Sequence, residues 1–95
     1  MAKIRRLVLD VVIPNIVDVV KLTQDLADLA AVKGANSMVS EIDKNVINLK
    51  LVLEGADLKF KEIEGVIQSH GGSVHSIDNV VAGKEIIEVV ETPQD

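Results

Sequence analysis

Apolar and polar residues alternate along the first part of the chain, and this alternation predicts its first element. Residues 4–13 read IRRLVLDVVI, and a period of two is typical of a strand whose side chains point alternately to opposite faces. Pro14 has no N–H to donate to a neighbouring strand, so the strand is expected to end there. One face is then aliphatic (Leu7, Leu9, Val11, Ile13) and the other mixed (Arg6, Val8, Asp10, Val12).

The period then changes to steps of three and four, which is the spacing of one helix face. Asn15 is a candidate N-cap for this helix, and Gly34 is a natural stop. We therefore predict an amphipathic helix between these two residues. Its apolar stripe consists of Ile16, Val19, Val20, Leu22, Leu26, Leu29 and Ala30.

A hairpin, a second helix and a further strand follow. Residues 35–42 alternate imperfectly, residues 43–45 are turn formers, and residues 46–54 alternate cleanly. Asp57 is a candidate N-cap for a helix that carries an apolar stripe and ends at residues 70–72. Residues 73–81 are interpreted as the last strand of the core.

The order of strand, helix, strand, strand, helix, strand predicts an α+β fold, the ferredoxin-like βαββαβ sandwich. We expect an antiparallel four-stranded sheet with both helices on one face, the fourth strand at one edge and the second at the other. The first and third strands are expected to pair in parallel. We expect residues 1–83 to form this domain and residues 84–95 to form a C-terminal arm. Ile86 to Val90 is interpreted as a fifth strand or as an extended part of that arm.

Composition adds an argument about assembly. The chain has 95 residues, of which 47% are apolar and only 1% aromatic. A domain of this size buries only about 60–65% of the surface that its unfolded chain exposes, so aliphatic side chains are left over. We expect a homo-oligomer in which the open sheet face and residues 86–90 meet a neighbour. The alternative is that the arm folds back on its own sheet edge. The candidates left over are Val8, Val12, Val52, Ile87 and Val89.

Charge and missing residue types exclude several functions. The chain has no cysteine, which excludes disulfides, thiolate zinc sites and thiol nucleophiles. Ten basic against fifteen acidic residues give a net charge of −5, and Phe60 is the one aromatic residue, so nucleic-acid binding is not expected. Apolar runs are far shorter than a membrane span of about 20 residues. We expect a cytoplasmic protein without nucleic-acid or membrane partners.

Acidic residues are the candidates for chemistry. In the expected topology Asp10, Glu54, Asp57 and His75 lie toward one end of the sheet, whereas Glu41 and Asp43 flank the hairpin at the other end. Asp78 follows His75 by three residues. Carboxylate oxygens without thiolates suit calcium, magnesium or manganese, and an imidazole favours manganese or zinc.

Each of these residues also has an ordinary structural interpretation. Asp10 opposite Lys50 or Arg6 would be a cross-strand ion pair, Asp57 would cap a helix, and Asp43 would belong to a turn. His75 would be a strand residue bonded to a neighbour. These interpretations and the cation site both stay open at this point.

Four strings carry a resemblance to a known family: RRLVLDV at 5–11, SEIDK at 40–44, GGSVHSIDNVVAGK at 71–84 and ETPQD at 91–95. Together the strings resemble archaeal proteins of the family named domain of unknown function 211. The resemblance implies a ferredoxin-like domain, ring-like homo-oligomers, no established enzymatic activity, cation binding and a regulatory or signalling role. Glu54 is outside these strings and is set aside, which leaves as metal candidates Asp10, Glu41, Asp43, His75 and Asp78.

The expected function is a non-enzymatic oligomeric regulatory or ligand-sensing module. It would bind a divalent cation, a small ligand or a protein partner near subunit interfaces, with no catalytic residues and no organic cofactor. The alternatives are a metal-dependent enzyme that uses Asp10, His75 and Asp78, with His75 as general base, or a purely structural scaffold ring.

Overall fold

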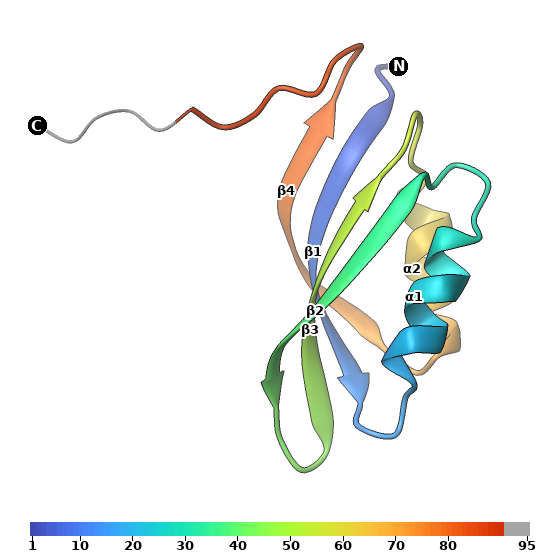
Figure 1. The fold of residues 1–95 in the computed structure, drawn as a ribbon, viewed down its shortest axis with the longest axis vertical. Helices are drawn as coiled ribbons and strands as arrows, with labels where there is room; N and C mark the ends of the chain where they lie inside the picture. Colours follow the sequence, from blue (N-terminus) through green and yellow to red (C-terminus); the bar gives the residue numbers. More distant parts are fainter. Residues whose placement is uncertain (91–95) are drawn as a thin grey trace, which may run out of the picture.

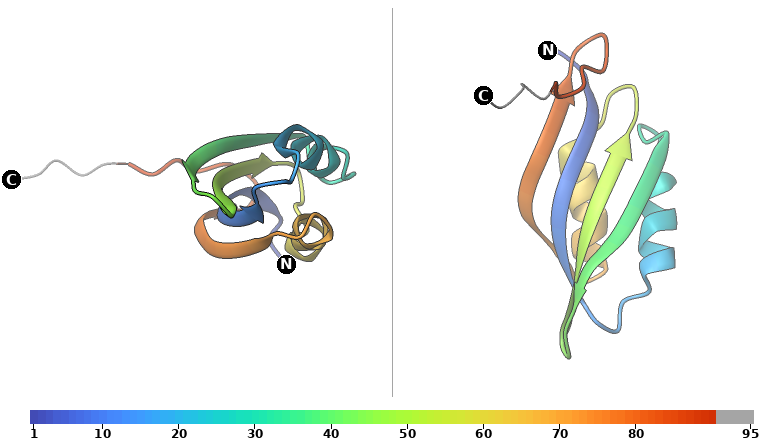
Figure 2. Two further views of the ribbon diagram at one scale, coloured as in Figure 1. Left: turned by 90° about the horizontal axis from the view of Figure 1, so that it is seen from below. Right: turned by 60° about the vertical axis from the view of Figure 1, so that its left-hand side comes forward.

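Two helices cover one face of a four-stranded antiparallel sheet in the computed structural model, which describes residues 1–90 (Figure 1). Within residues 1–90, no helix or further strand covers the opposite face of the sheet (Figure 2). This arrangement confirms the predicted ferredoxin-like βαββαβ fold. The elements are β1 (Ile4–Pro14), α1 (Val19–Ala27), β2 (Gly34–Ile42), β3 (Val46–Glu54), α2 (Phe60–Ser69) and β4 (Ser73–Ala82).

The strand order is β2-β3-β1-β4, so the second and fourth strands lie at the edges as predicted. The expected parallel pairing of the first and third strands is wrong, because β1 and β3 run antiparallel with Asp10 opposite Lys50. The physical reason lies in the connections. The crossover through α1 brings β2 back in the direction of β1, and the short hairpin at residues 43–45 then reverses β3.

The covered face of the sheet holds the core. The inward-facing side chains of β1 are at most 2% exposed, and leucines of β3 lie beside them. Each helix adds two fully buried side chains on its inner face, as the three-and-four spacing predicted. The main core residues are Leu7, Leu9, Val11, Ile13, Leu22, Leu26, Leu49, Leu51, Leu53, Ile63 and Ile67.

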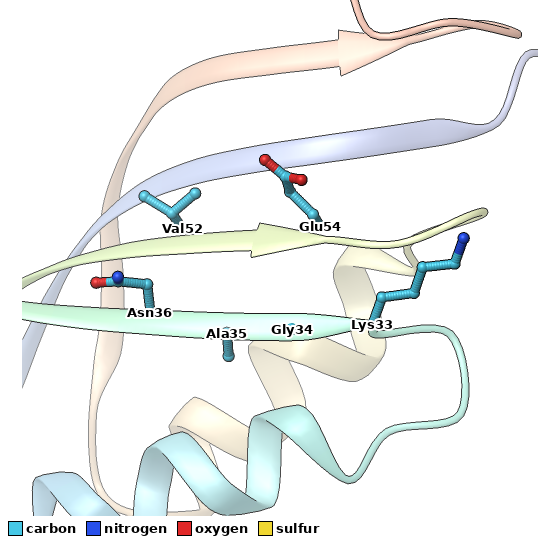
Figure 3. A pocket seen from close by; sticks show the side chains of 6 residues that line it. All are labelled: Lys33, Gly34, Ala35, Asn36, Val52 and Glu54. Atoms are coloured by element: carbon cyan, nitrogen blue, oxygen red, sulfur yellow. The ribbon is translucent and has the colours of Figure 1, made fainter.

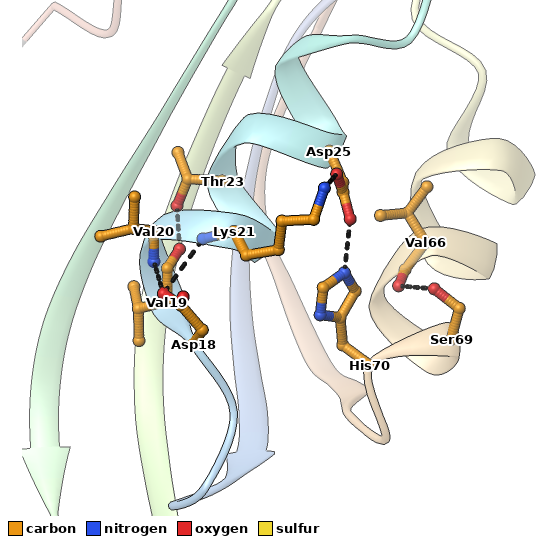
Figure 4. Close-up of polar contacts among 9 residues, drawn as sticks. All are labelled: Asp18, Val19, Val20, Lys21, Thr23, Asp25, Val66, Ser69 and His70. Carbon is orange, nitrogen blue, oxygen red and sulfur yellow. Dashed lines mark hydrogen bonds and ion pairs between the residues drawn. The ribbon is translucent and has the colours of Figure 1, made fainter.

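Helix α1 is shorter than predicted and begins later. Asp18, not Asn15, is its N-cap: one carboxylate oxygen accepts hydrogen bonds from the N–H groups of Val20 (2.9 Å) and Lys21 (3.2 Å) (Figure 4). Asn15 instead joins the loop after β1 to the hairpin, where its N–H donates to the carbonyl of Asn45 at 3.0 Å. The helix ends at Ala27, well before Gly34, where β2 begins.

Helix α2 also differs from prediction at its start. The N-cap position is Lys59, whose side chain makes no capping hydrogen bond, and the predicted cap Asp57 instead forms an ion pair with Lys59 at 2.8 Å. The apolar stripe of α2 is where the pattern placed it. The spacing of apolar residues therefore located both helices, whereas the candidate capping residues did not locate their first residues.

A polar chain joins the two helices on their outer side. His70, the C-cap of α2, contacts Asp25 of α1 through Nε2 at 2.8 Å, and Lys21 contacts the other oxygen of that carboxylate at 2.9 Å (Figure 4). The Lys21 ammonium first, and the His70 contact second, hold the pKa of Asp25 below its usual range. These polar contacts link α1 to α2 through Asp25 and His70, which are 45 residues apart in the sequence.

Residues 84–90 form no strand, so the predicted fifth strand at residues 86–90 is wrong, and the role of this segment as an intersubunit arm stays a prediction. Gly83 has a positive φ of 124°, a conformation that suits glycine, and the chain leaves the sheet there (Figure 1). Residues 91–95 of the predicted arm lie outside the described residues. Across residues 1–90, no helix combines the length and apolar character needed to span a membrane.

Candidate functional site

Asp10 lies at the centre of a polar row that crosses the open face of the sheet. Its neighbours Leu9 and Val11 point into the core, so the alternation of β1 directs Asp10 to the opposite face. Lys50 is its register partner on β3, and Ser76 is its register partner on β4. Three strands thus contribute one polar side chain each to the same row.

The predicted residues His75 and Asp78 both occupy irregular positions of β4. The register against β1 shifts between Val8 and Leu9, which leaves Asp78 as the extra residue. It shifts again between Asp10 and Val11, which leaves His75 as the extra residue. Such β-bulges change the direction of a side chain and are enriched next to functional sites. The two bulges flank the strand position opposite Asp10.

The carboxylate of Asp78 is already well partnered. The hydroxyl of Ser76 donates to it at 2.7 Å, and the ammonium of Lys50 lies 3.3 Å from its other oxygen. The hydrogen bond from Ser76 is the main reason why the pKa of Asp78 lies below its usual range, and the charges of Lys50 and His75 add to the effect. Asp78 is therefore ionised at neutral pH, and Lys50 occupies the place where a metal cation would bind it.

Glu41 and Asp43 are separate from this row. Asp43 shapes the hairpin turn: one carboxylate oxygen accepts hydrogen bonds from the N–H groups of Asn45 (2.8 Å) and Val46 (3.1 Å), and these bonds lower its pKa. Glu41 lies on β2 opposite Asn48 and is exposed.

The expected grouping of acidic residues by sheet end is wrong, because it rested on a parallel β1–β3 pair. With β3 antiparallel to β1, the hairpin lies at the end of the sheet where β1 finishes, next to Pro14. Glu54 lies opposite Arg6 instead, toward the other end, and Asp57 follows beyond it.

No three acidic or histidine side chains converge closely enough to hold a metal ion within residues 1–90. The structure does bring Asp10, His75 and Asp78 to neighbouring positions on β1 and β4. A hard cation could use the oxygens of Asp10, Asp78 and Ser76 there only if the Lys50 ammonium moved away.

A second polar cluster of the open face was missed by the reasoning from sequence. Arg6 donates from Nε to Glu54 at 2.7 Å and from its two terminal nitrogens to Glu88 of the arm at 2.9 Å each. Antiparallel pairing of β1 with β3 would have indicated the contact with Glu54. No sequence signal joins Arg6 to Glu88, because they are 82 residues apart.

Comparison with known proteins gives a consistent result. Residues 5–95 match the family described as DUF211, Uncharacterized ArCR. The chain is also similar to the uncharacterized protein MJ0319 of Methanocaldococcus jannaschii, with 49% identity over 92 residues that cover 97% of this chain and 95% of that protein. Because both matches span nearly the whole chain, this protein belongs to the DUF211 family of uncharacterised archaeal proteins.

Proposed function

We propose that the protein is a non-enzymatic, self-assembling regulatory or ligand-sensing module that binds a divalent cation near contacts between its subunits. The observation that carries this proposal is the set of large apolar side chains left exposed outside a closed core. Met38 on β2 is 64% exposed, and Ile87 and Val89 on the arm are 69% and 80% exposed. Met38 lies at the β2 edge and the arm continues from the β4 edge, and large apolar side chains exposed in this way are typical of interaction surfaces.

The position of these side chains supports assembly of subunits through the edges of the sheet and through the arm. The open-face residues Val8, Val12 and Val52 are half-buried, whereas large apolar side chains on both outer strands and on the arm are exposed. Met1, Ile16 and Val20 are exposed elsewhere on the domain. Edge strands with exposed apolar side chains pair with other chains unless something covers them. A second subunit would cover these surfaces.

The cation is proposed for the row around Asp10 and Asp78. Calcium, magnesium and manganese prefer carboxylate and hydroxyl oxygens, which Asp10, Asp78 and Ser76 supply. Lys50 and a divalent cation compete for the same carboxylate, because Lys50 lies 3.3 Å from Asp78. Cation binding is therefore expected to strengthen when the charge of Lys50 is removed.

Native mass spectrometry and sedimentation test the assembly. The wild-type chain is expected to form a closed homo-oligomer, and the Ile87→Ser/Val89→Ser double variant is expected to shift toward monomers. A wild-type chain that sediments as a monomer would contradict the proposal.

Thermal unfolding tests the cation. Calcium, magnesium or manganese is added after EDTA treatment, and the change in Tm is measured. The ion is expected to raise the Tm of wild type, to raise the Tm of Lys50→Gln by a larger amount, and to leave the Tm of Asp78→Asn unchanged. Glu62→Gln, an exposed change on α2 away from the row, is the matched control. If neither wild type nor Lys50→Gln responds to any of the three ions, the cation site is wrong.

A further inference from the structure

The root of the arm is held firmly although most of its side chains are uncovered. Arg5 donates from Nη1 to the carbonyl of Lys84 at 2.7 Å, and Arg6 makes two hydrogen bonds of 2.9 Å to Glu88. The Arg6 guanidinium also holds the pKa of Glu88 below its usual range. Ile87, Val89 and Val90 remain exposed beyond these contacts. The arm is thus anchored near its start, and its backbone runs away from the sheet while these apolar side chains stay exposed (Figure 1).

The two edges of the sheet differ in how well they are protected against pairing. Edge strand β4 has two bulges that carry His75 and Asp78, and charges and bulges both discourage a further strand. Edge strand β2 reads GANSMV over residues 34–39, with no charge, no proline and no register shift before Val39. Met38 and Val39 are exposed on it. Strand β2 is therefore the edge open to an added strand.

A depression lies beside this edge on the open face of the sheet (Figure 3). A Cβ atom added to Gly34 would meet no atom within 4 Å, so there is room above the strand at that point. Glu54, which borders the depression, is neutralised by Arg6, whereas Lys33 makes no ion pair among residues 1–90. The depression is about 510 Å³ and is lined by Lys33, Gly34, Ala35, Asn36, Val52 and Glu54.

We propose that the arm of one copy docks along edge strand β2 of the next copy, with an apolar arm side chain over Gly34 and Glu85 facing Lys33. Length and charge support this occupant. Residues 86–90 follow the bend at residues 83–85 and span about 17 Å when extended at about 3.3 Å per residue, enough to follow five of the six uncharged residues 34–39. Glu85 of the arm is attracted by the positive charge of Lys33, which directly precedes β2.

This docking rests on the proposed self-assembly and names the two surfaces that meet. The arm and the β2 edge are different parts of the chain, so each copy has one arm to donate and one β2 edge to accept the arm of a neighbour. The contact between copies is therefore head-to-tail. A head-to-tail contact closes into a ring when the rotation between copies permits it.

Single cysteine variants test the docking directly, because the natural chain has no cysteine. Val89→Cys is mixed with Asn36→Cys on β2 or, as the matched control, with Ile77→Cys on β4, and the mixtures are mildly oxidised. Disulfides between unlike chains, identified by mass spectrometry, are expected to be several-fold more abundant with Asn36→Cys. Ile87→Cys, mixed in the same way, allows for a shift of register along the edge.

A charge on the edge gives an independent measurement. Met38→Lys is expected to convert the assembly to monomers with an unchanged circular dichroism spectrum, whereas Ile77→Lys on the other edge leaves it assembled. If wild type is an oligomer but cross-links form at Ile77→Cys instead of Asn36→Cys, or Met38→Lys still assembles, the docking is wrong and self-assembly stands. If wild type is monomeric, both the docking and the proposed function are wrong.

Discussion

The two faces of the sheet are built from alternate residues of the same strands, yet they are completed in different ways. Leu9 lies under the helices and is fully buried, whereas its neighbour Asp10 lies in a polar row that no helix or strand of residues 1–90 covers. The covered face is aliphatic and contains no buried polar side chain among residues 1–90. The open face instead gathers ion pairs: Lys50 with Asp78, and Arg6 with Glu54 and Glu88. The packing that stabilises the fold therefore lies mainly on the covered face.

The sharpest test of this difference changes neighbouring residues of β1. Leu9→Ala leaves a cavity in the core and is expected to lower the free energy of unfolding by about 2–5 kcal/mol. Asp10→Ala, on the open face, is expected to leave the urea midpoint close to that of wild type. Urea unfolding at one fixed protein concentration makes the comparison, since assembly adds to apparent stability. Equal losses in the two variants would mean that Asp10 also supports the fold.

Two glycines provide a test of intermediate size. A Cβ atom on Gly55 would lie 2.1 Å from the carbonyl oxygen of Ala31 and 2.9 Å from a methyl group of Leu58. Gly55→Ala is therefore expected to cost about 1–3 kcal/mol in unfolding free energy. Gly34→Ala has open space on the other face and is expected to be neutral or to stabilise by up to about 1 kcal/mol. A thermal or urea unfolding series that reverses this order would contradict the described packing.

The smallest expected effect concerns the pH dependence of the open face. The pKa of Asp78 is lower in the folded chain than in the unfolded chain, mainly through the hydrogen bond from Ser76. Its contribution to stability is therefore complete above the unfolded pKa of about 3.9 and is lost as the pH falls through the folded pKa. Asp78→Asn is expected to show a smaller fall of Tm between pH 6 and pH 3 than wild type. Glu62→Gln, as the control, should keep the wild-type slope.

The elements could be predicted from sequence because their patterns are local. Alternation in residues 4–13 located β1 and its inward face, and the three-and-four spacing located both helices. The helix starts were harder, since Asn15 and Asp18 are both good capping residues. The choice between them depends on the contact of Asn15 with the hairpin at Asn45, which no local pattern contains.

In the candidate site, too, some features were predictable from the sequence and others depended on the tertiary structure. Asp10, His75 and Asp78 were singled out for their chemistry, and the structure places them at neighbouring positions of β1 and β4. The expectation that Glu54 and Asp57 lie at the same end of the sheet as Asp10 was wrong, because β3 runs antiparallel to β1 and not parallel to it. Two contacts of Asp78 could be identified only from the structure: the ion pair with Lys50, which would compete with a cation, and the hydrogen bond from the hydroxyl of Ser76.

Local hydrophobic patterns were enough to assign the core face and the order of elements that gives the fold class, and composition was enough to indicate a surplus of aliphatic side chains. None of these features depends on which distant residues meet. Three-dimensional packing was needed for the polar row, the two bulges of β4 and the anchoring of the arm. Each of these depends on strand direction or on partners far apart, as with Arg6 and Glu88 at a separation of 82 residues. Contacts over such distances depend on how the sheet arranges its strands in space.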